Sequence, residues 1–171
     1  MKIQYIQHLL DEIESFDQDL IKHYERVAML SYVFGKELEL DGQERERLYW
    51  LGFLHEIGKF KNDNIKTYPI VSALLLKGNN EFYKLSTIIE QIEENIDGSG
   101  FPYQKTGDDI HLYASIVHIC DYFDHLRMSG DSYSECIKNV KKQNNIIAPK
   151  RLISIFSKMM VSHPELKFDY Q

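Results

Sequence analysis

Cysteine is scarce in this chain, which has two among its 171 residues, Cys120 and Cys136. Their spacing matches no cysteine-based metal site. We therefore expect two free thiols in a reducing compartment, which indicates a cytoplasmic location.

Long apolar runs are also absent. No run approaches the roughly 18 residues that a membrane span requires, so we expect no membrane contact. The first residues, MKIQYIQHLLDEIESF, are too acidic and too interrupted for a signal peptide. The net charge of −6 argues against DNA or RNA as a partner.

Acidic residues are missing from one segment, residues 137–163. The same segment contains the basic residues Lys138, Lys141, Lys142, Lys150, Arg151 and Lys158. We favour a solvated helix face as the explanation of this pattern. The alternative is a docking surface for an acidic signalling protein or for a phosphate ligand.

Strand-like alternation, internal repeats and low-complexity segments are absent, and apolar residues recur at helical spacing throughout. A first apolar stripe, for example, consists of Ile3, Ile6, Leu9, Leu10 and Ile13. We predict one all-α domain over residues 1–171 with about eight helices. Their approximate ranges are 3–15, 17–38, 41–55, 67–76, 81–95, 109–127, a helix from 132, and 149–162.

Capping residues mark several of the expected helix ends. Asp41 and Ser132 are each followed three residues later by Glu, which is the pattern of a capping box. Asp109 is expected to cap the helix that follows it, and Gly58 to end the helix that precedes it.

Four residues on these helices or at their ends can bind a metal: His23, His55, Glu56 and Asp121. Imidazole and carboxylate groups suit a divalent transition metal, for which we consider Mn, Fe, Ni and Zn. Such an ion makes water a nucleophile near neutral pH. Lys59 can hold a substrate phosphate by its charge.

Four short segments in this order resemble a known family. They are HYERVA at 23–28, FLHEIGK at 53–59, DGSGFP at 97–102 and IVHICDYFDHL at 116–126. Together they resemble the HD-GYP branch of the HD phosphohydrolase superfamily. The resemblance implies an HD-domain-like helical bundle with a motif core at about 20–127, an N-terminal helix at about 3–15 and C-terminal helices at about 132–162.

The resemblance also implies a function, the cleavage of cyclic di-GMP or a related dinucleotide at two or three metals. It makes His23, His55, Glu56 and Asp121 the metal ligands and Lys59 a catalytic residue. The loop expected beside the substrate contains Asp97, Gly98, Gly100, Phe101 and Pro102.

The chain departs from the family at several of these positions. Glu56 stands where the family has Asp, and its extra C–C bond moves the carboxylate by roughly 1.5 Å. Tyr68 and Ile92 stand at histidine positions, and Phe101 replaces a tyrosine. Glu93 is a candidate replacement ligand. We therefore expect a dismantled multi-metal centre with one divalent cation, or none if the centre is fully lost.

Two further histidines, His118 and His125, fall on the same helix face as Asp121. They are either replacement ligands or histidines that are hydrated or hydrogen-bonded at the edge of the core. We favour the second interpretation for both.

Two functions follow from these observations. We favour a weak or inactive cyclic-dinucleotide phosphodiesterase homologue that acts in signalling, alone or in trans. The alternative is an active single-metal phosphohydrolase that acts on a nucleotide or a simple phosphate ester.

Overall fold

The computed structural model describes every residue except 1, 63, 65, 80–81 and 171. Within the first helix, side chains are described from residue 6 onward. Within this part of the chain there are eight α-helices and no named strand, which confirms the all-α prediction. The helices are α1 (Lys2–Phe16), α2 (Gln18–Glu37), α3 (Gly42–Leu54), α4 (Tyr68–Lys77), α5 (Ser86–Ile89), α6 (Leu112–Met128), α7 (Tyr133–Lys142) and α8 (Lys150–Ser162). Short 3-10 helices occupy Tyr83–Leu85, Gly107–Asp109 and Pro164–Leu166.

The capping boxes predicted at Asp41 and Ser132 are both present. The Asp41 carboxylate accepts the amide hydrogen of Glu44 at 2.8 Å, and Glu44 in turn accepts that of Asp41 at 3.0 Å. Ser132 and Glu135 exchange the same two hydrogen bonds at the start of α7. These side chains satisfy amide groups that have no partner within the helix, so α3 and α7 begin where the sequence indicates.

Two of the predicted helix boundaries are wrong. The helix predicted at 81–95 is much shorter in the structure, where α5 ends at Ile89 and the chain turns at 90–94 into the following loop. Residue 81, its predicted start, lies outside the described residues. Asp109 belongs to a 3-10 turn, and His111 caps α6 instead. The α3 helix ends at Leu54, within one residue of the predicted end, but its C-cap is His55 and not Gly58.

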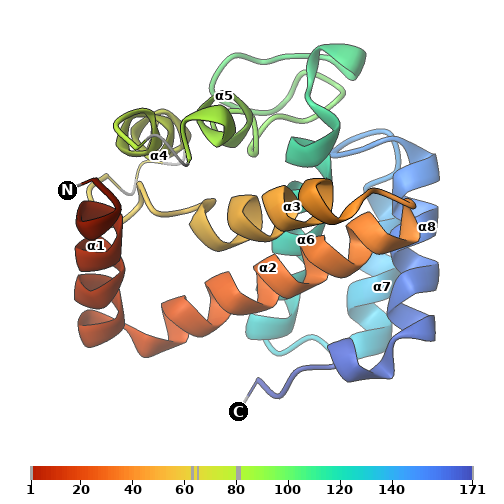
Figure 1. Cartoon of the computed structure of the whole chain (residues 1–171). Coiled ribbons are helices and arrows are strands. Elements are labelled where there is room, and N and C mark those ends of the chain that lie inside the picture. Colours follow the sequence, from red (N-terminus) through yellow and green to blue (C-terminus); the bar gives the residue numbers. More distant parts are fainter. Residues whose placement is uncertain (1, 63, 65, 80–81, 171) are drawn as a thin grey trace.

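Helices α2 and α3 form the centre of the fold and run in opposite directions (Figure 1). Gly52 lets them approach closely, because a Cβ atom there would lie 2.8 Å from the Cα atom of Ala28. On α2 the residues Tyr24, Val27 and Phe34 are fully buried, and α2 packs on both α3 and α6. The close approach fixes the position of the end of α3 relative to the first half of α2.

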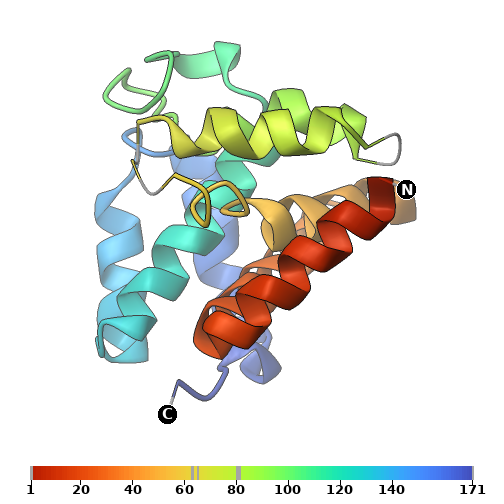
Figure 2. The same ribbon diagram turned by 90° about the vertical axis from the view of Figure 1, so that its left-hand side faces the viewer.

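The remaining helices cover this central pair. α6 packs on both α2 and α3, and α7 and α8 pack against α6 at one end of the bundle (Figure 1). Figure 2 shows α1 at the opposite end, with α4 above it. The stripe predicted for α1 is confirmed at Ile6, Leu9 and Ile13, which are buried, while the side chain of Ile3 lies outside the described residues. Within the described part of the chain, no helix has the length and apolar character to cross a membrane.

Candidate metal centre

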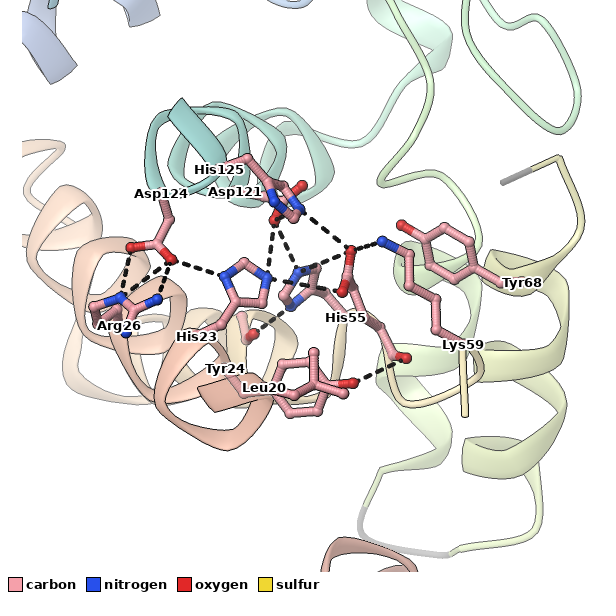
Figure 3. A network of polar contacts seen from close by, with 12 residues as sticks. Leu20, His23, Tyr24, Arg26, His55, Lys59, Tyr68, Asp121, Asp124 and His125 are labelled. Atoms are coloured by element: carbon pink, nitrogen blue, oxygen red, sulfur yellow. Dashed lines mark hydrogen bonds and ion pairs between the residues drawn. The ribbon is translucent and has the colours of Figure 1, made fainter. Parts of the chain in front are cut away.

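The first part of the centre is His23, which lies on the buried face of α2 (Figure 3). Its Nδ1 nitrogen donates to the Asp124 carboxylate at 2.8 Å. Its Nε2 nitrogen is buried and has no hydrogen-bond partner, although Asp121 Oδ1 lies 3.2 Å away without hydrogen-bond alignment. The ring is therefore oriented by one nitrogen and presents the other toward the centre.

The second part is the turn that follows α3. His55 Nδ1 donates to the carbonyl oxygen of Gly52 at 2.6 Å, which points Nε2 toward Asp121 at 3.1 Å. Glu56 is buried beside it. Gly58 keeps the turn close to α4, because a Cβ atom there would lie 2.5 Å from the backbone nitrogen of Ser72. The role of Gly58 is thus a close approach between two backbones.

The third part is α6, which contributes Asp121 and His125 one helical turn apart. His125 Nε2 lies 3.3 Å from Asp121 Oδ1 and 3.6 Å from Glu56 Oε1. His23, Glu56, Asp121 and His125 each offer one ligand atom, and these four atoms lie within 4.8 Å of one another. The structure therefore brings together residues that are up to 102 positions apart, since 125 − 23 = 102.

The structure places the four predicted metal-binding residues together, and it adds one more. His23, Glu56 and Asp121 belong to the four-residue cluster, while His55 contacts Asp121 from the side and lies 3.8 Å from Glu56 Oε1. The interpretation of His125 as a hydrated or hydrogen-bonded histidine agrees with its 46% exposed side chain, and its alternative role as a replacement ligand is compatible with its place in this cluster. The i, i+4 spacing from Asp121 was the available signal, because such residues are neighbours on a helix.

This buried cluster contains carboxylates next to imidazole and ammonium groups, and their interactions shift the pKa values. Burial opposes the charged form of His23, but the Asp121 and Asp124 carboxylates outweigh it and raise its pKa to about 9. Burial likewise opposes ionisation of Glu56, but His125, His55 and Lys59 lower its pKa to about 2. Without a cation, protonated histidine and lysine balance the carboxylates.

The donor set and its spacing fit a divalent transition metal. Two atoms that each lie about 2.1 Å from one ion are at most about 4.2 Å apart. Four contacts within the cluster, from 3.2 to 3.8 Å, meet this limit, but they use both oxygens of Glu56. With one ligand atom from each residue the atoms lie within 4.8 Å, so the side chains would close slightly around an ion. The Asp124–His23 pair repeats the carboxylate–histidine arrangement that orients metal-bound imidazoles. The His23 Nε2 nitrogen makes an ion pair with Asp121 but no aligned hydrogen bond, which is compatible with a cation bound between these atoms.

A second polar group lies next to this cluster, at positions where the family resemblance implies further ligands. The Lys59 ammonium donates to Glu56 and lies 4.8 Å from the centre of the Tyr68 ring. The Tyr68 hydroxyl donates to Glu93, and burial raises the pKa of Tyr68 well above its usual value. Ile92 is buried in the core. Here a neutral phenol binds Glu93, the candidate additional ligand.

The DGSGFP loop is a braced turn connected to this second group. Asp97 accepts a hydrogen bond from the Ser99 amide at 2.9 Å, and Gly98 has a φ of +85°. Gly100 lies against backbone, because a Cβ atom there would be 2.1 Å from the Asn95 nitrogen. The Phe101 amide donates to the Glu93 carbonyl oxygen at 2.8 Å. The loop is thus attached beside Glu93, and its role toward a substrate stays a prediction, as does that of Pro102.

Two further buried residues of α6 are His118 and Asp124. His118 Nδ1 lies 3.1 Å from the carbonyl oxygen of Glu94, as expected for a hydrogen-bonded histidine. Asp124 is fully buried and was missed in the sequence, because nothing in the spacing distinguishes it from a solvated carboxylate. Its partner Arg26 follows His23 by three positions, so both lie on the same face of α2. This spacing points to a shared partner only when the position of Asp124 in the structure is known.

Comparisons with known proteins agree on one family. A family model described as HD domain matches residues 7–145. The chain is 24% identical to "Cyclic di-GMP phosphodiesterase PdeB" of Borreliella burgdorferi over 162 residues, covering 80% of this chain and 43% of that protein. It is 26% identical over 120 residues to "3'3'-cGAMP-specific phosphodiesterase 3" of Vibrio cholerae, covering 61% and 26% respectively.

A solved structure shares the fold. It is a cyclic GMP-AMP-specific phosphodiesterase of V. cholerae, V-cGAP3, with a TM-score of 0.67 and 18% identity. The match covers 84% of this chain and 44% of that one. The chain thus spans less than half the length of these relatives.

Proposed function

The chain belongs to the HD domain family, and from this premise we propose that it holds one divalent cation and binds a cyclic dinucleotide that it cleaves poorly. The supporting observation is the convergence of ligand atoms from His23, Glu56, Asp121 and His125, among them a buried imidazole nitrogen that makes no aligned hydrogen bond. Relatives named as cyclic-dinucleotide phosphodiesterases support the substrate class.

The side chains around the cluster suit a phosphate ester. A cation held by the four residues would supply Lewis acidity for the activation of water and for the neutralisation of phosphate charge. His125, with 46% of its side chain exposed, gives the cluster an open side. Lys59, with 30% exposed, places an ammonium group beside Glu56, where it would attract a phosphate oxygen.

The proposed weak activity follows from the group beside the cluster. In two-metal sites the pair of ions stabilises both the attacking oxygen and the leaving oxygen at phosphorus. A site with one ion stabilises only one of them as well. Of the positions that would hold a second ion, Tyr68 is a neutral phenol and Ile92 is apolar, so Glu93 is the one remaining anionic ligand. We propose that Lys59 partly replaces the missing positive charge.

Metal binding is the first test. Titration of the chelator-treated protein with Mn²⁺ should give about one ion per chain. His23→Ala and Asp121→Asn should weaken binding at least about 100-fold, since even outer-shell changes cost 10–100-fold. His8→Ala is a matched control, because His8 lies on the exposed side of α1. Absence of Mn²⁺ uptake, or two ions per chain, would contradict the single-cation proposal.

Turnover is the second test. The Mn²⁺-loaded protein is incubated with cyclic di-GMP and with 3'3'-cGAMP, and linear dinucleotide is measured by chromatography. We expect binding with slow cleavage that disappears in His55→Ala. Fast cleavage would overturn the weak-enzyme proposal. Cleavage of a simple phosphate monoester with no binding of either dinucleotide would favour the alternative single-metal phosphohydrolase.

The biological setting is part of the proposal. A cyclic-dinucleotide binder that cleaves slowly would report the nucleotide to a partner protein, so we assign the chain to signalling. Both cysteines are free and buried, which is compatible with the proposed cytoplasmic location.

A further inference from the structure

Asp124 connects the candidate metal centre to the rest of the molecule. Its Oδ2 oxygen accepts from His23 Nδ1 at 2.8 Å and from the Arg26 guanidinium at 2.8 Å. Its Oδ1 oxygen accepts from Arg26 Nε at 2.8 Å and from the Tyr170 hydroxyl at 2.5 Å. The carboxylate is fully buried, and both of its oxygens accept hydrogen bonds from more than one donor.

Tyr170 reaches this carboxylate from the segment that follows the last 3-10 helix. Its ring lies against two guanidinium groups, with the Arg26 Cζ carbon 4.5 Å and the Arg127 Cζ carbon 4.7 Å from the ring centre. Such contacts hold an aromatic ring in place and cover the cation from water. The residue is therefore placed both to bind Asp124 and to position Arg26.

We infer that Tyr170 is a positioning residue for the metal centre, which acts through Asp124 to orient the His23 imidazole toward the cation. This inference rests on the proposed function, since it concerns the affinity of the same site. It assigns a role in metal binding to a residue 147 positions from His23, since 170 − 23 = 147.

The physical argument starts from the carboxylate torsion. The terminal torsion of an Asp side chain is broad, so its donors decide the plane of the carboxylate. The Tyr170 hydroxyl and the Arg26 guanidinium fix Oδ1, and Oδ2 is thereby aimed at His23 Nδ1. The imidazole then has one orientation, and its Nε2 faces Glu56 and Asp121.

Loss of the Tyr170 hydroxyl would remove one of the donors at Oδ1 and leave the ring in place. Arg26 would still bind both oxygens, but Oδ1 would lose its shortest hydrogen bond. The carboxylate would then be held less firmly about its terminal torsion, and so would the His23 ring that it orients. Metal–ligand distances tolerate deviations of only about 0.2 Å, so a small rotation reduces affinity. Tyr170 stays a donor because burial and the Asp124 charge raise its pKa above the usual value.

The test compares two Tyr→Phe variants. Tyr133 is the matched control, because its hydroxyl also donates one hydrogen bond, to Met160, and its ring also faces a cation, Lys167 at 4.7 Å. We expect Tyr170→Phe to weaken Mn²⁺ binding by about 10-fold, as for other outer-shell changes. Tyr133→Phe should bind Mn²⁺ as the wild type does. Equal affinity in all three proteins would overturn the inference.

A second readout uses the metal-free protein and is independent of Mn²⁺ uptake. In ¹H–¹⁵N spectra, the His23 Nδ1–H proton should be shifted downfield and protected from exchange in the wild type and in Tyr133→Phe. It should exchange faster in Tyr170→Phe. An unchanged signal would overturn the inference. If the wild type takes up no Mn²⁺, the proposed function fails, and this signal alone shows whether Tyr170 orients His23.

Discussion

The substitution Gly52→Ala tests whether the close approach of α2 and α3 builds the candidate metal centre. A Cβ atom at this position would lie 2.8 Å from Ala28 Cα and 2.9 Å from Val27 O. Both are backbone atoms, so no side-chain rotation can relieve the contact. Carbon atoms pack best at about 3.5–4.0 Å, and the helices would have to separate by roughly 0.7 Å.

The expected loss of stability follows from two opposing effects. Overpacking costs about 1–3 kcal/mol and sometimes more, and contact with backbone atoms alone places this case at the upper end. Replacing Gly by Ala within a helix returns about 1 kcal/mol. A net loss of about 2 kcal/mol lowers Tm by roughly 4–8 °C for a domain of this size.

The assay is thermal unfolding by circular dichroism, combined with Mn²⁺ titration. Gly42→Ala is the control, since its nearest neighbour is the end of the Arg45 side chain at 3.9 Å. We expect Gly42→Ala to leave Mn²⁺ binding unchanged and not to lower Tm, since the added methyl meets no close neighbour and alanine favours the helix. Gly52→Ala should lower Tm and weaken Mn²⁺ binding together, because His23 moves with α2. A Gly52→Ala protein as stable as the wild type, with the same Mn²⁺ affinity, would refute this reasoning.

Three other changes probe the fold. Asp41→Ala removes a helix cap and should cost about 1 kcal/mol, or roughly 2–4 °C in Tm; an unchanged Tm would contradict it. Ser72→Ala deletes a buried hydroxyl that accepts an amide hydrogen at 2.9 Å, and should cost about 1–3 kcal/mol in urea unfolding; a value near zero would count against that bond. The carboxylates of Glu165 and Glu37 raise the pKa of His163, so its stabilisation is complete below about pH 6.5 and is lost as pH rises through the folded-state value. His163→Gln should therefore lower Tm more at pH 6 than at pH 9, and equal losses would refute this pH dependence.

Much of the fold could be predicted from helical periodicity and capping residues. The starts of α3 and α7 agree because Asp41 and Ser132 act through neighbours three residues away. The stretch after Ile89 could not be predicted in this way. There Glu94 is buried and accepts amide hydrogens from Tyr103 and Lys105, which lie nine and eleven positions later, and such contacts depend on the loop conformation.

Of the candidate site, the convergence of the motif residues could be predicted from the sequence. His23, His55, Glu56 and Asp121 converge as expected, because their order along the chain resembles that of a family with one fold. His125 was considered as a replacement ligand but not favoured, since a partly exposed histidine at a helix face is usually solvated, and its place in the cluster keeps both interpretations open. Asp124 and Tyr170 were missed, because their roles exist only through contacts that span 101 and 46 positions.

The placement of the ligand atoms has a consequence for folding cooperativity. They come from α2, from the turn after α3 and from α6, so a bound cation would connect three segments that are distant in the sequence. At a concentration 100 times its Kd, such a cation adds about 2.7 kcal/mol to the folded state. Opening of any one segment would release it. In the loaded protein, amide hydrogens of all three segments would therefore exchange with solvent through one shared opening, and local fraying of each segment would be suppressed.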